Sequence, residues 1–198
     1  MNGQDKAASQ SRRQLLKKGI GLGMIATNVA GVNVLMTSRS AYAKSLALKT
    51  LNKTEAKILE DFAETLVPGA REAGIAHYLD YNLTTEPTKT TLIASYFNLT
   101  PPFLPFYRGG IESLSSYSLE KTNKEFEHMS QDEKEKIISS LFQHMSGHDL
   151  SGWQSETSPF LFYQCVRSDA LDLVYGTPEG FQKLGIPYME HILPPSTW

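Results

Sequence analysis

The sequence is poor in cysteine, since Cys165 is the only one among 198 residues. A chain with one thiol forms no internal disulfide, so Cys165 is either buried and reduced or paired with another chain. The first alternative is a small buried residue on a helix that behaves as a hydrophobic side chain. The second makes Cys165 a candidate for an interchain disulfide, which an oxidising compartment permits. We favour this second alternative, because Arg167, Ser168 and Asp169 indicate that this turn has a polar side near a surface.

The sequence also lacks the short motifs that commonly hold cofactors or nucleophiles. It contains no GxGxxG fingerprint, phosphate-binding loop, CxxCH haem site, iron–sulfur cysteine spacing or GxSxG turn. We interpret Asp169 and Asp172 as partners of Arg167 or of solvent rather than as an acid–base pair. Spacing alone therefore assembles no active site, and no cofactor is expected in this chain.

An excess of basic residues is absent as well. The chain holds 19 Lys and Arg against 21 Asp and Glu; six of the basic residues and one acidic residue lie in 1–43, which leaves 44–198 with a net charge of −7. Nucleic-acid binding needs a basic face for phosphate contacts. The composition therefore excludes a nucleic-acid partner.

No long, strongly apolar run is present. The run from Gly19 to Met36 contains Asn28, Asn33 and several glycines. A membrane-spanning helix needs about 20 mostly apolar residues, so this run is a poor candidate for one. Its weak apolar character suits the central region of a signal peptide instead.

The residues on either side of this run support that interpretation. Ala41-Tyr42-Ala43, after it, has the small-x-small pattern of a cleavage site. A basic segment with paired arginines precedes it, which indicates the twin-arginine (Tat) export route. The residues of this export signal are Ser11, Arg12, Arg13, Leu15, Leu16 and Lys17.

We therefore expect residues 1–43 to be a Tat signal peptide, cleaved after Ala43, and residues 44–198 to form a single helical domain. An uncleaved membrane anchor is the alternative. Tat carries folded proteins, usually because a cofactor or a partner must be loaded first. Since this chain shows no cofactor motif, the simplest hypothesis is that the cofactor sits on a second chain that is exported as a passenger.

Apolar residues at helical spacing predict an all-α fold, a compact domain of about five to six helices with an irregular apolar C-terminal tail. Asn52 caps the first expected helix, and Ser158 with Pro159 opens the last long one, which Gly176 ends. Ser130 and Glu133 form a capping box. The expected helices cover residues 53–66, 73–83, 89–97, 110–126, 131–146 and 159–175.

The tail from residue 179 to 198 is rich in apolar side chains among glycines and prolines. Such a segment is too apolar for simple disorder. It either wraps its own domain or docks on another protein. Its candidate interface residues are Phe181, Leu184, Ile186, Tyr188 and Trp198.

His144 and His148 are weak candidates for a metal site. Their spacing of four places both on one face of a continuous helix, as in two-histidine zinc motifs. Gly147 interrupts that helix, however, and the other interpretation is a pair of surface histidines at a helix end, where they suit the helix dipole. We assign no metal site.

Three segments of the chain are similar to a known family. They are Thr65-Leu66-Val67-Pro68-Gly69-Ala70-Arg71-Glu72-Ala73-Gly74-Ile75, then 160–176 with its end Leu173-Val174-Tyr175-Gly176, and 180–187 with Gly180-Phe181 and Leu184-Gly185-Ile186-Pro187. Together with the twin-arginine leader, they make the chain resemble the gluconate 2-dehydrogenase subunit 3 family, the small or gamma subunit of periplasmic FAD-dependent sugar and sugar-acid dehydrogenases. The family more often has tryptophan where Phe181 stands.

The resemblance implies a non-catalytic helical subunit of an oxidoreductase complex. It would bind a large flavoprotein of the glucose–methanol–choline type, help it mature and carry it through the Tat translocase into the periplasm. FAD would then reside in that partner, and haem c, in a multihaem cytochrome c subunit, or an iron–sulfur cluster would reside in further subunits. The cytochrome would hold the complex at the inner membrane.

Two other functions remain as alternatives at this point. One is a stand-alone exported helical protein that binds a metal or another ligand through the region of His144 and His148. The other is a small enzyme whose site has no recognised motif. Co-elution of a flavoprotein would distinguish the first hypothesis from both.

Overall fold

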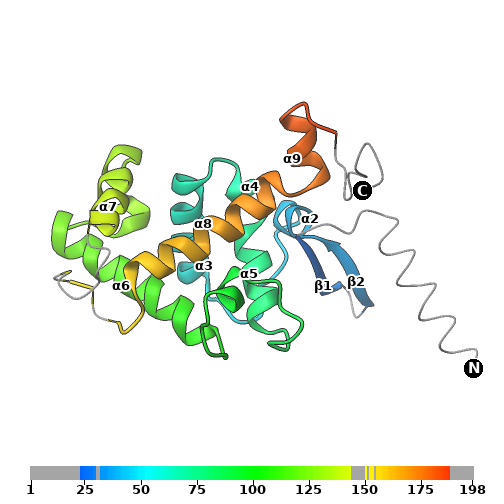
Figure 1. The fold of residues 1–198 in the computed structure, drawn as a ribbon, viewed down its shortest axis with the longest axis horizontal. Coiled ribbons are helices and arrows are strands. Elements are labelled where there is room, and N and C mark those ends of the chain that lie inside the picture. The colour runs from blue at the N-terminus through cyan, green and yellow to red at the C-terminus, as the bar shows by residue number, and fades with distance from the viewer. Residues whose placement is uncertain (1–22, 30–31, 144–149, 151, 154, 188–198) are drawn as a thin grey trace, which may run out of the picture.

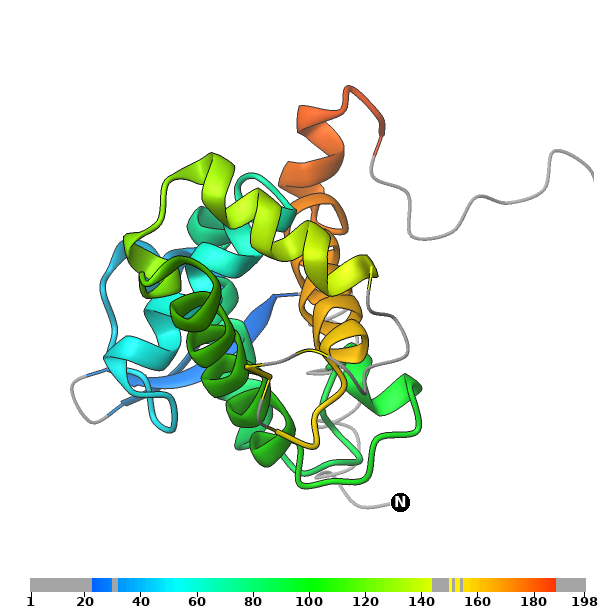
Figure 2. The ribbon, with the colours of Figure 1, turned by 90° about the vertical axis from the view of Figure 1, so that its left-hand side faces the viewer.

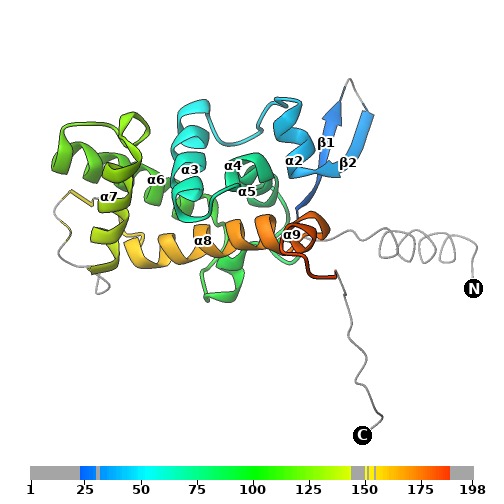
Figure 3. The same ribbon diagram turned by 90° about the horizontal axis from the view of Figure 1, so that it is seen from above.

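The chain is predominantly helical in the part that the computed structural model describes, which comprises residues 23–29, 32–143, 150, 152–153 and 155–187. The long helix α8, Pro159–Tyr175, runs through the middle of the molecule (Figure 1). Seen from above, α8 lies along one side of the other helices, with α7 near its beginning and α9 at its end (Figure 3). Helix α9, where the expected interface residues begin, therefore lies at one end of the molecule.

The described chain starts with a β-hairpin and a short helix rather than with an apolar helix. Strands β1, Met24–Val29, and β2, Val32–Thr37, pair antiparallel, with Met24 opposite Thr37. Helix α2, Ser38–Ala43, follows directly. The hairpin and α2 lie at the same end of the molecule as α9 (Figures 1 and 3).

Helix α3, Lys53–Leu66, begins and ends where the sequence predicts. The side chain of Asn52 accepts a hydrogen bond from the Glu55 N–H at 2.9 Å, and the Glu55 carboxylate accepts one from the Asn52 N–H at 2.8 Å. This reciprocal pair satisfies two N–H groups that the helix start would otherwise leave unpaired. Pro68 ends the helix, because the residue before a proline is disfavoured in helical geometry.

Two short helices, α4, Ala70–Ala73, and α5, Ile75–Leu83, follow and join at Gly74. The φ angle of Gly74 is +81°, in the region that favours glycine. A Cβ at this position would lie 2.2 Å from the backbone oxygen of Ser38 in α2. The glycine therefore permits α2 to pack backbone against backbone on the α4–α5 turn.

Helix α6, Leu104–Thr122, begins six residues before the expected start at Gly110. Pro105 occupies its first turn, where the missing proline N–H has no hydrogen bond to lose. The helix ends at Asn123, which adopts the left-handed conformation with φ +57°.

A 3₁₀ turn, η2, Phe126–His128, leads to helix α7, Gln131–Gln143. The predicted capping box at its start is confirmed. The Ser130 N–H donates to the Glu133 carboxylate at 2.8 Å, and the Glu133 N–H donates to the Ser130 hydroxyl at 3.3 Å. The end view shows α7 alongside α6 and the start of α8 (Figure 2).

Helix α8 has the bounds that Ser158, Pro159 and Gly176 predict, and it contributes much of the core. The ring of its Phe162 stacks on Phe62 of α3, with centroids 5.3 Å apart. Burying one such side chain contributes about 1.5–3 kcal/mol. The largest fully buried side chains are Phe62, Tyr78, Tyr107, Phe126, Phe162, Leu59, Ile75, Leu79, Leu92, Ile111, Leu114 and Leu141.

The predicted all-α class is confirmed, and three local predictions were wrong. The expected helix 89–97 is only a 3₁₀ turn, η1, Ile93–Tyr96. Residues 179–183, expected to be irregular, belong to helix α9, Pro178–Lys183, which the Thr177 hydroxyl caps. The strands β1 and β2 were not expected, and they make the only sheet of the described residues. None of the described helices is both long and apolar enough to cross a membrane.

Candidate partner interface and processing site

An exposed apolar surface lies where α8 meets α9. Leu184 is 53% exposed and Ile186 is 51% exposed, both just after α9, and Tyr175 at the end of α8 is 36% exposed. We call Tyr175, Leu184 and Ile186 the α8–α9 patch. Exposed large apolar side chains are candidates for a protein interface.

Gly180 positions this patch. A Cβ on Gly180 would lie 2.2 Å from the backbone oxygen of Val174 and 2.7 Å from the Cα of Tyr175. The backbone of α9 therefore packs directly on the last turn of α8, which only glycine permits. This contact holds α9 at the end of α8 (Figure 1).

The structure describes only one of the remaining predicted interface and metal residues. Phe181 is half-buried on α9. Tyr188, Trp198, His144 and His148 lie outside the described residues. The export-signal residues Ser11, Arg12, Arg13, Leu15, Leu16 and Lys17 lie outside them too.

The predicted cleavage site lies in α2. Ala41 is fully buried, whereas Ala43, the last residue of α2, is exposed. The Leu46 N–H donates back to the Ala41 carbonyl at 3.1 Å, which closes the turn after the helix. The site is thus helical and half covered in this structure.

Helix α5 holds the segment that follows the cleavage site. The His77 ring nitrogen Nε2 lies 3.0 Å from the Leu46 carbonyl oxygen. The buried Asp80 carboxylate accepts backbone N–H hydrogen bonds from three successive residues at 2.7–2.8 Å, those of Lys49, Thr50 and Leu51. Hydrogen bonds from several backbone N–H groups stabilise a carboxylate and fix the chain that donates them.

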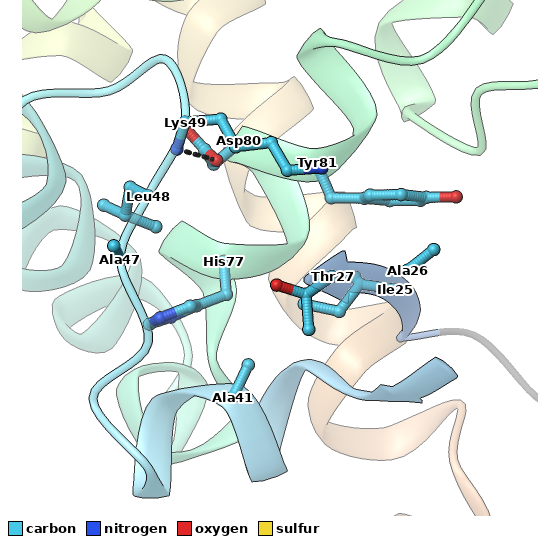
Figure 4. A pocket seen from close by; sticks show the side chains of 10 residues that line it. All are labelled: Ile25, Ala26, Thr27, Ala41, Ala47, Leu48, Lys49, His77, Asp80 and Tyr81. Carbon is cyan, nitrogen blue, oxygen red and sulfur yellow. Dashed lines mark hydrogen bonds between the residues drawn. The ribbon is translucent and has the colours of Figure 1, made fainter. Parts of the chain in front are cut away.

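Figure 4 shows the small cavity between this segment, α5 and β1, with His77 and Asp80 on one wall and Ile25 and Thr27 on the other. Its volume is about 20 Å³, which is room for about one water molecule. The region is therefore a packed contact among β1, α5 and residues 47–49, and its cavity is too small for a cofactor.

Cys165 lies on α8 with none of its surface exposed. Burial raises the pKa of its thiol to about 12, and the nearby Asp169 contributes to the same shift. A thiol in this state reacts slowly, because the thiolate is the nucleophile. In the isolated chain the structure favours the buried alternative, and an interchain disulfide would require this part of the core to open.

Asp169 was expected to pair with Arg167 or with solvent, and that interpretation was wrong. It is fully buried; its carboxylate accepts hydrogen bonds from the Tyr107 hydroxyl at 2.9 Å and from the Ile93 N–H at 3.0 Å. Burial raises the pKa of Asp169 to about 7, against the effect of these two hydrogen bonds. Asp169 therefore ties η1 and α6 to α8. Its place between Val166 and Ala170 on the apolar face was the signal that the sequence offered.

Sequence reasoning also missed a buried ion cluster at Asp61. Its carboxylate, 1% exposed, contacts Lys57 at 2.7 Å, Lys134 at 2.9 Å and the Arg71 guanidinium. Arg71 belongs to the segment that carries the family resemblance. Next to it, the Glu64 carboxylate accepts the N–H groups of Gly69 and Arg71, both at 2.9 Å. These carboxylates of α3 hold the start of α4 in place and connect it to α7.

One set of described residues has the spacing of possible metal ligands. Ligand atoms of Glu125, Glu127 and His128 lie within 4.8 Å of one another around η2. The set is largely exposed, and the His128 ring nitrogen Nδ1 lies 3.2 Å from the Glu125 carboxylate. An ion pair between neighbours explains this arrangement without a metal.

These features define a small helical domain with an apolar patch at one end. Its buried carboxylates are paired with cations at Asp61 and with hydrogen-bond donors at Asp169. A family model described as gluconate 2-dehydrogenase subunit 3 matches residues 53–194, more than two thirds of the chain. The chain belongs to the gluconate 2-dehydrogenase subunit 3 family, which confirms the resemblance. The family's name makes its members one subunit of a multi-subunit gluconate dehydrogenase. No curated protein and no solved structure was found to match the chain.

Proposed function

We propose that this chain is a non-catalytic small subunit of a periplasmic FAD-dependent sugar or sugar-acid dehydrogenase of the gluconate type. It is required for the maturation of the flavoprotein subunit and for its export by Tat. The observation that carries this proposal is the family match over residues 53–194. The twin-arginine pattern with Arg12 and Arg13 supports the export role.

The main partner is a large FAD-containing subunit of the glucose–methanol–choline type, which binds the cofactor and performs the chemistry. A multihaem cytochrome c subunit completes the complex and holds it at the inner membrane. The Tat translocase is a transient partner of the leader. Since residues 44–198 are net acidic, no nucleic acid is included.

The α8–α9 patch supports docking of the flavoprotein. Leu184 and Ile186 are each about half exposed, so covering the exposed half of either one contributes about half of the roughly 1.5–3 kcal/mol of a full burial. In the sequence, the apolar tail follows the patch, and its residues from 188 onward lie outside the described part of the chain. The tail and the patch together form the proposed interface.

Co-purification tests the proposal. The chain is expressed with the flavoprotein encoded next to it, purified through a tag and examined for a flavin absorbance spectrum. A yellow flavoprotein in stoichiometric amount supports the assignment. A monomer without flavin that carries a bound metal would support the stand-alone binding protein instead.

Three matched variants then locate the interface. Leu184→Asp and Ile186→Asp each place a charge in the α8–α9 patch, and we expect each to weaken the complex about tenfold or more. Leu119→Asp is the control, because Leu119 is 50% exposed on α6, outside the patch. Equal binding by all three variants would show that the patch is not the interface.

A further inference from the structure

The leader is held to the folded domain on the amino-terminal side of the predicted cleavage site. The Ser38 hydroxyl of α2 donates a 2.6 Å hydrogen bond to the Ala73 carbonyl at the end of α4, and both groups are buried. The Ser38 N–H donates to the Gly23 carbonyl at 2.7 Å, which ties α2 to the start of the hairpin. Next to it, Gly74 leaves room for the Ser38 carbonyl to touch the α4–α5 turn.

The hairpin adds an apolar contact to this attachment. Ile25 of β1 is 4% exposed and lines the contact with α5 (Figure 4), whereas Leu35 of β2 is 45% exposed. A Cβ on Gly23 would lie 2.9 Å from the side chain of Leu173 on α8. Ile25 and Gly23 therefore pack on the domain, whereas Leu35 on the second strand is exposed.

The carboxyl-terminal side of the cleavage site is held as well. His77 contacts the Leu46 carbonyl, and Asp80 binds the backbone N–H groups of three successive residues from Lys49 onward. The bond after Ala43 thus lies between two attachments to the α4–α5 unit, only a few residues away on each side.

We propose that residues 23–29 and 32–51 act as an intramolecular clamp, in which the docked leader shields its own cleavage site, and that α2 must detach from α4 and α5 before the chain is cut. A peptidase binds its substrate extended, so a helical site is cleaved only through local opening. The assignment of this cut to signal peptidase depends on the export function proposed above. The clamp itself rests on the packing alone.

The test uses the purified full-length chain and measures cleavage at two positions by mass spectrometry. Trypsin cuts after Arg39 within α2, which reports release of the clamp whatever the role of the leader. Cleavage after Arg167, on α8, reports unfolding of the whole domain. Signal peptidase in detergent micelles, with a synthetic peptide of residues 32–52 as comparator, reports cleavage after Ala43.

Two leader variants form a matched pair. Ile25→Ser removes the buried contact and Leu35→Ser an exposed one, while both lower the apolar character of the leader in a similar way. We expect Ile25→Ser to speed cleavage after Arg39 roughly tenfold or more and Leu35→Ser to leave it within about twofold of the parent chain. Ser38→Ala, which removes the hydrogen bond to Ala73, is expected to act in the same direction as Ile25→Ser.

Slow cleavage of the parent chain after Arg39, with Arg167 protected and the Ile25→Ser variant faster, supports the clamp. Equal trypsin rates for the parent chain, both hairpin variants and the free peptide would overturn it. Should signal peptidase leave the free peptide uncut, the cleavage assignment of the proposed function fails, while the trypsin comparison still decides whether the clamp exists.

Discussion

Replacing Asp61 by asparagine should destabilise the domain through the cations that it leaves without a partner. Asp61 is the only carboxylate in contact with Lys57, Arg71 and Lys134 among the ion pairs of the described residues. The Asp61→Asn substitution keeps the volume of the side chain but removes its charge and replaces one of its two acceptor oxygens with an NH2 donor. The three cations belong to α3, α4 and α7, so the loss affects the contact among these helices.

The exposure of the three cations sets the magnitude. Lys57 is 52% exposed and returns to water, so its pair with Asp61 contributes at most about 0.5 kcal/mol. Lys134 is only 12% exposed and lies over the Phe126 ring, so it remains largely desolvated without its partner. Breaking a fully buried pair costs about 3–5 kcal/mol. Since Arg71 is 35% exposed, we expect an intermediate loss of about 2–3 kcal/mol.

Urea denaturation of the parent chain and the variant measures this loss. Glu86→Gln is the control, because Glu86 and Lys89 form an exposed pair, and we expect it to change stability by less than about 0.5 kcal/mol. Adding Lys134→Met to Asp61→Asn should recover part of the loss, since no buried ammonium is then left unpaired. An Asp61→Asn variant as stable as the control, or a double variant less stable than the single one, would refute this reasoning.

The pH dependence provides a second check on Asp61. Burial favours the neutral form, but the hydrogen bonds from Lys57 and Lys134 outweigh it and lower the pKa of Asp61 below its ordinary value. The contribution of Asp61 is therefore present above its unfolded pKa of about 3.9 and is lost as the pH falls through the lower folded pKa. In acid, the parent chain and Asp61→Asn should converge in stability.

Two further predictions concern α8. Because burial raises the pKa of Asp169 to about 7, the folded chain keeps a proton that the unfolded chain has already released. Asp169 should therefore lower the stability of the domain as the pH rises from about 4 to about 7. The Asp169→Asn variant should show a flatter dependence of stability on pH in denaturation experiments, and an unchanged dependence would contradict the assignment. Because Cys165 is fully buried, we expect it to form no interchain disulfide. The subunits of the purified complex should then run as separate bands on a non-reducing gel, with thiols alkylated only after unfolding. A band at the summed mass that collapses on reduction would instead establish the interchain disulfide.

Local signals explain which parts of the fold the sequence could predict. The bounds of α3 and α8 follow from caps and breakers within a few residues of each end, such as Asn52 and Ser158. The helix expected over residues 89–97 does not form, because a residue distant in the sequence fixes the conformation of this segment. The Ile93 N–H donates to Asp169, 76 residues away in the sequence. No local pattern contains that contact.

The candidate sites divide in the same way. The sequence predicts Leu184 and Ile186 as interface residues from their apolar character in a segment rich in turns; the structure shows them exposed, and the interface stays a prediction. The attachment of residues 38–51 to α4 and α5 was not predictable. It depends on Gly74 and Asp80 meeting a segment some 30 residues earlier in the chain. The Asp61 cluster likewise requires Lys134, 73 residues away.

Export of the flavoprotein tests the proposed function most directly. The double variant Arg12→Lys and Arg13→Lys keeps the positive charge of the leader but removes the arginine pair that the Tat translocase reads. With the flavoprotein expressed alongside, dehydrogenase activity is measured in the periplasmic and cytoplasmic fractions. The account predicts that both chains, and the activity with them, stay in the cytoplasm. Normal periplasmic dehydrogenase activity in this variant would contradict it.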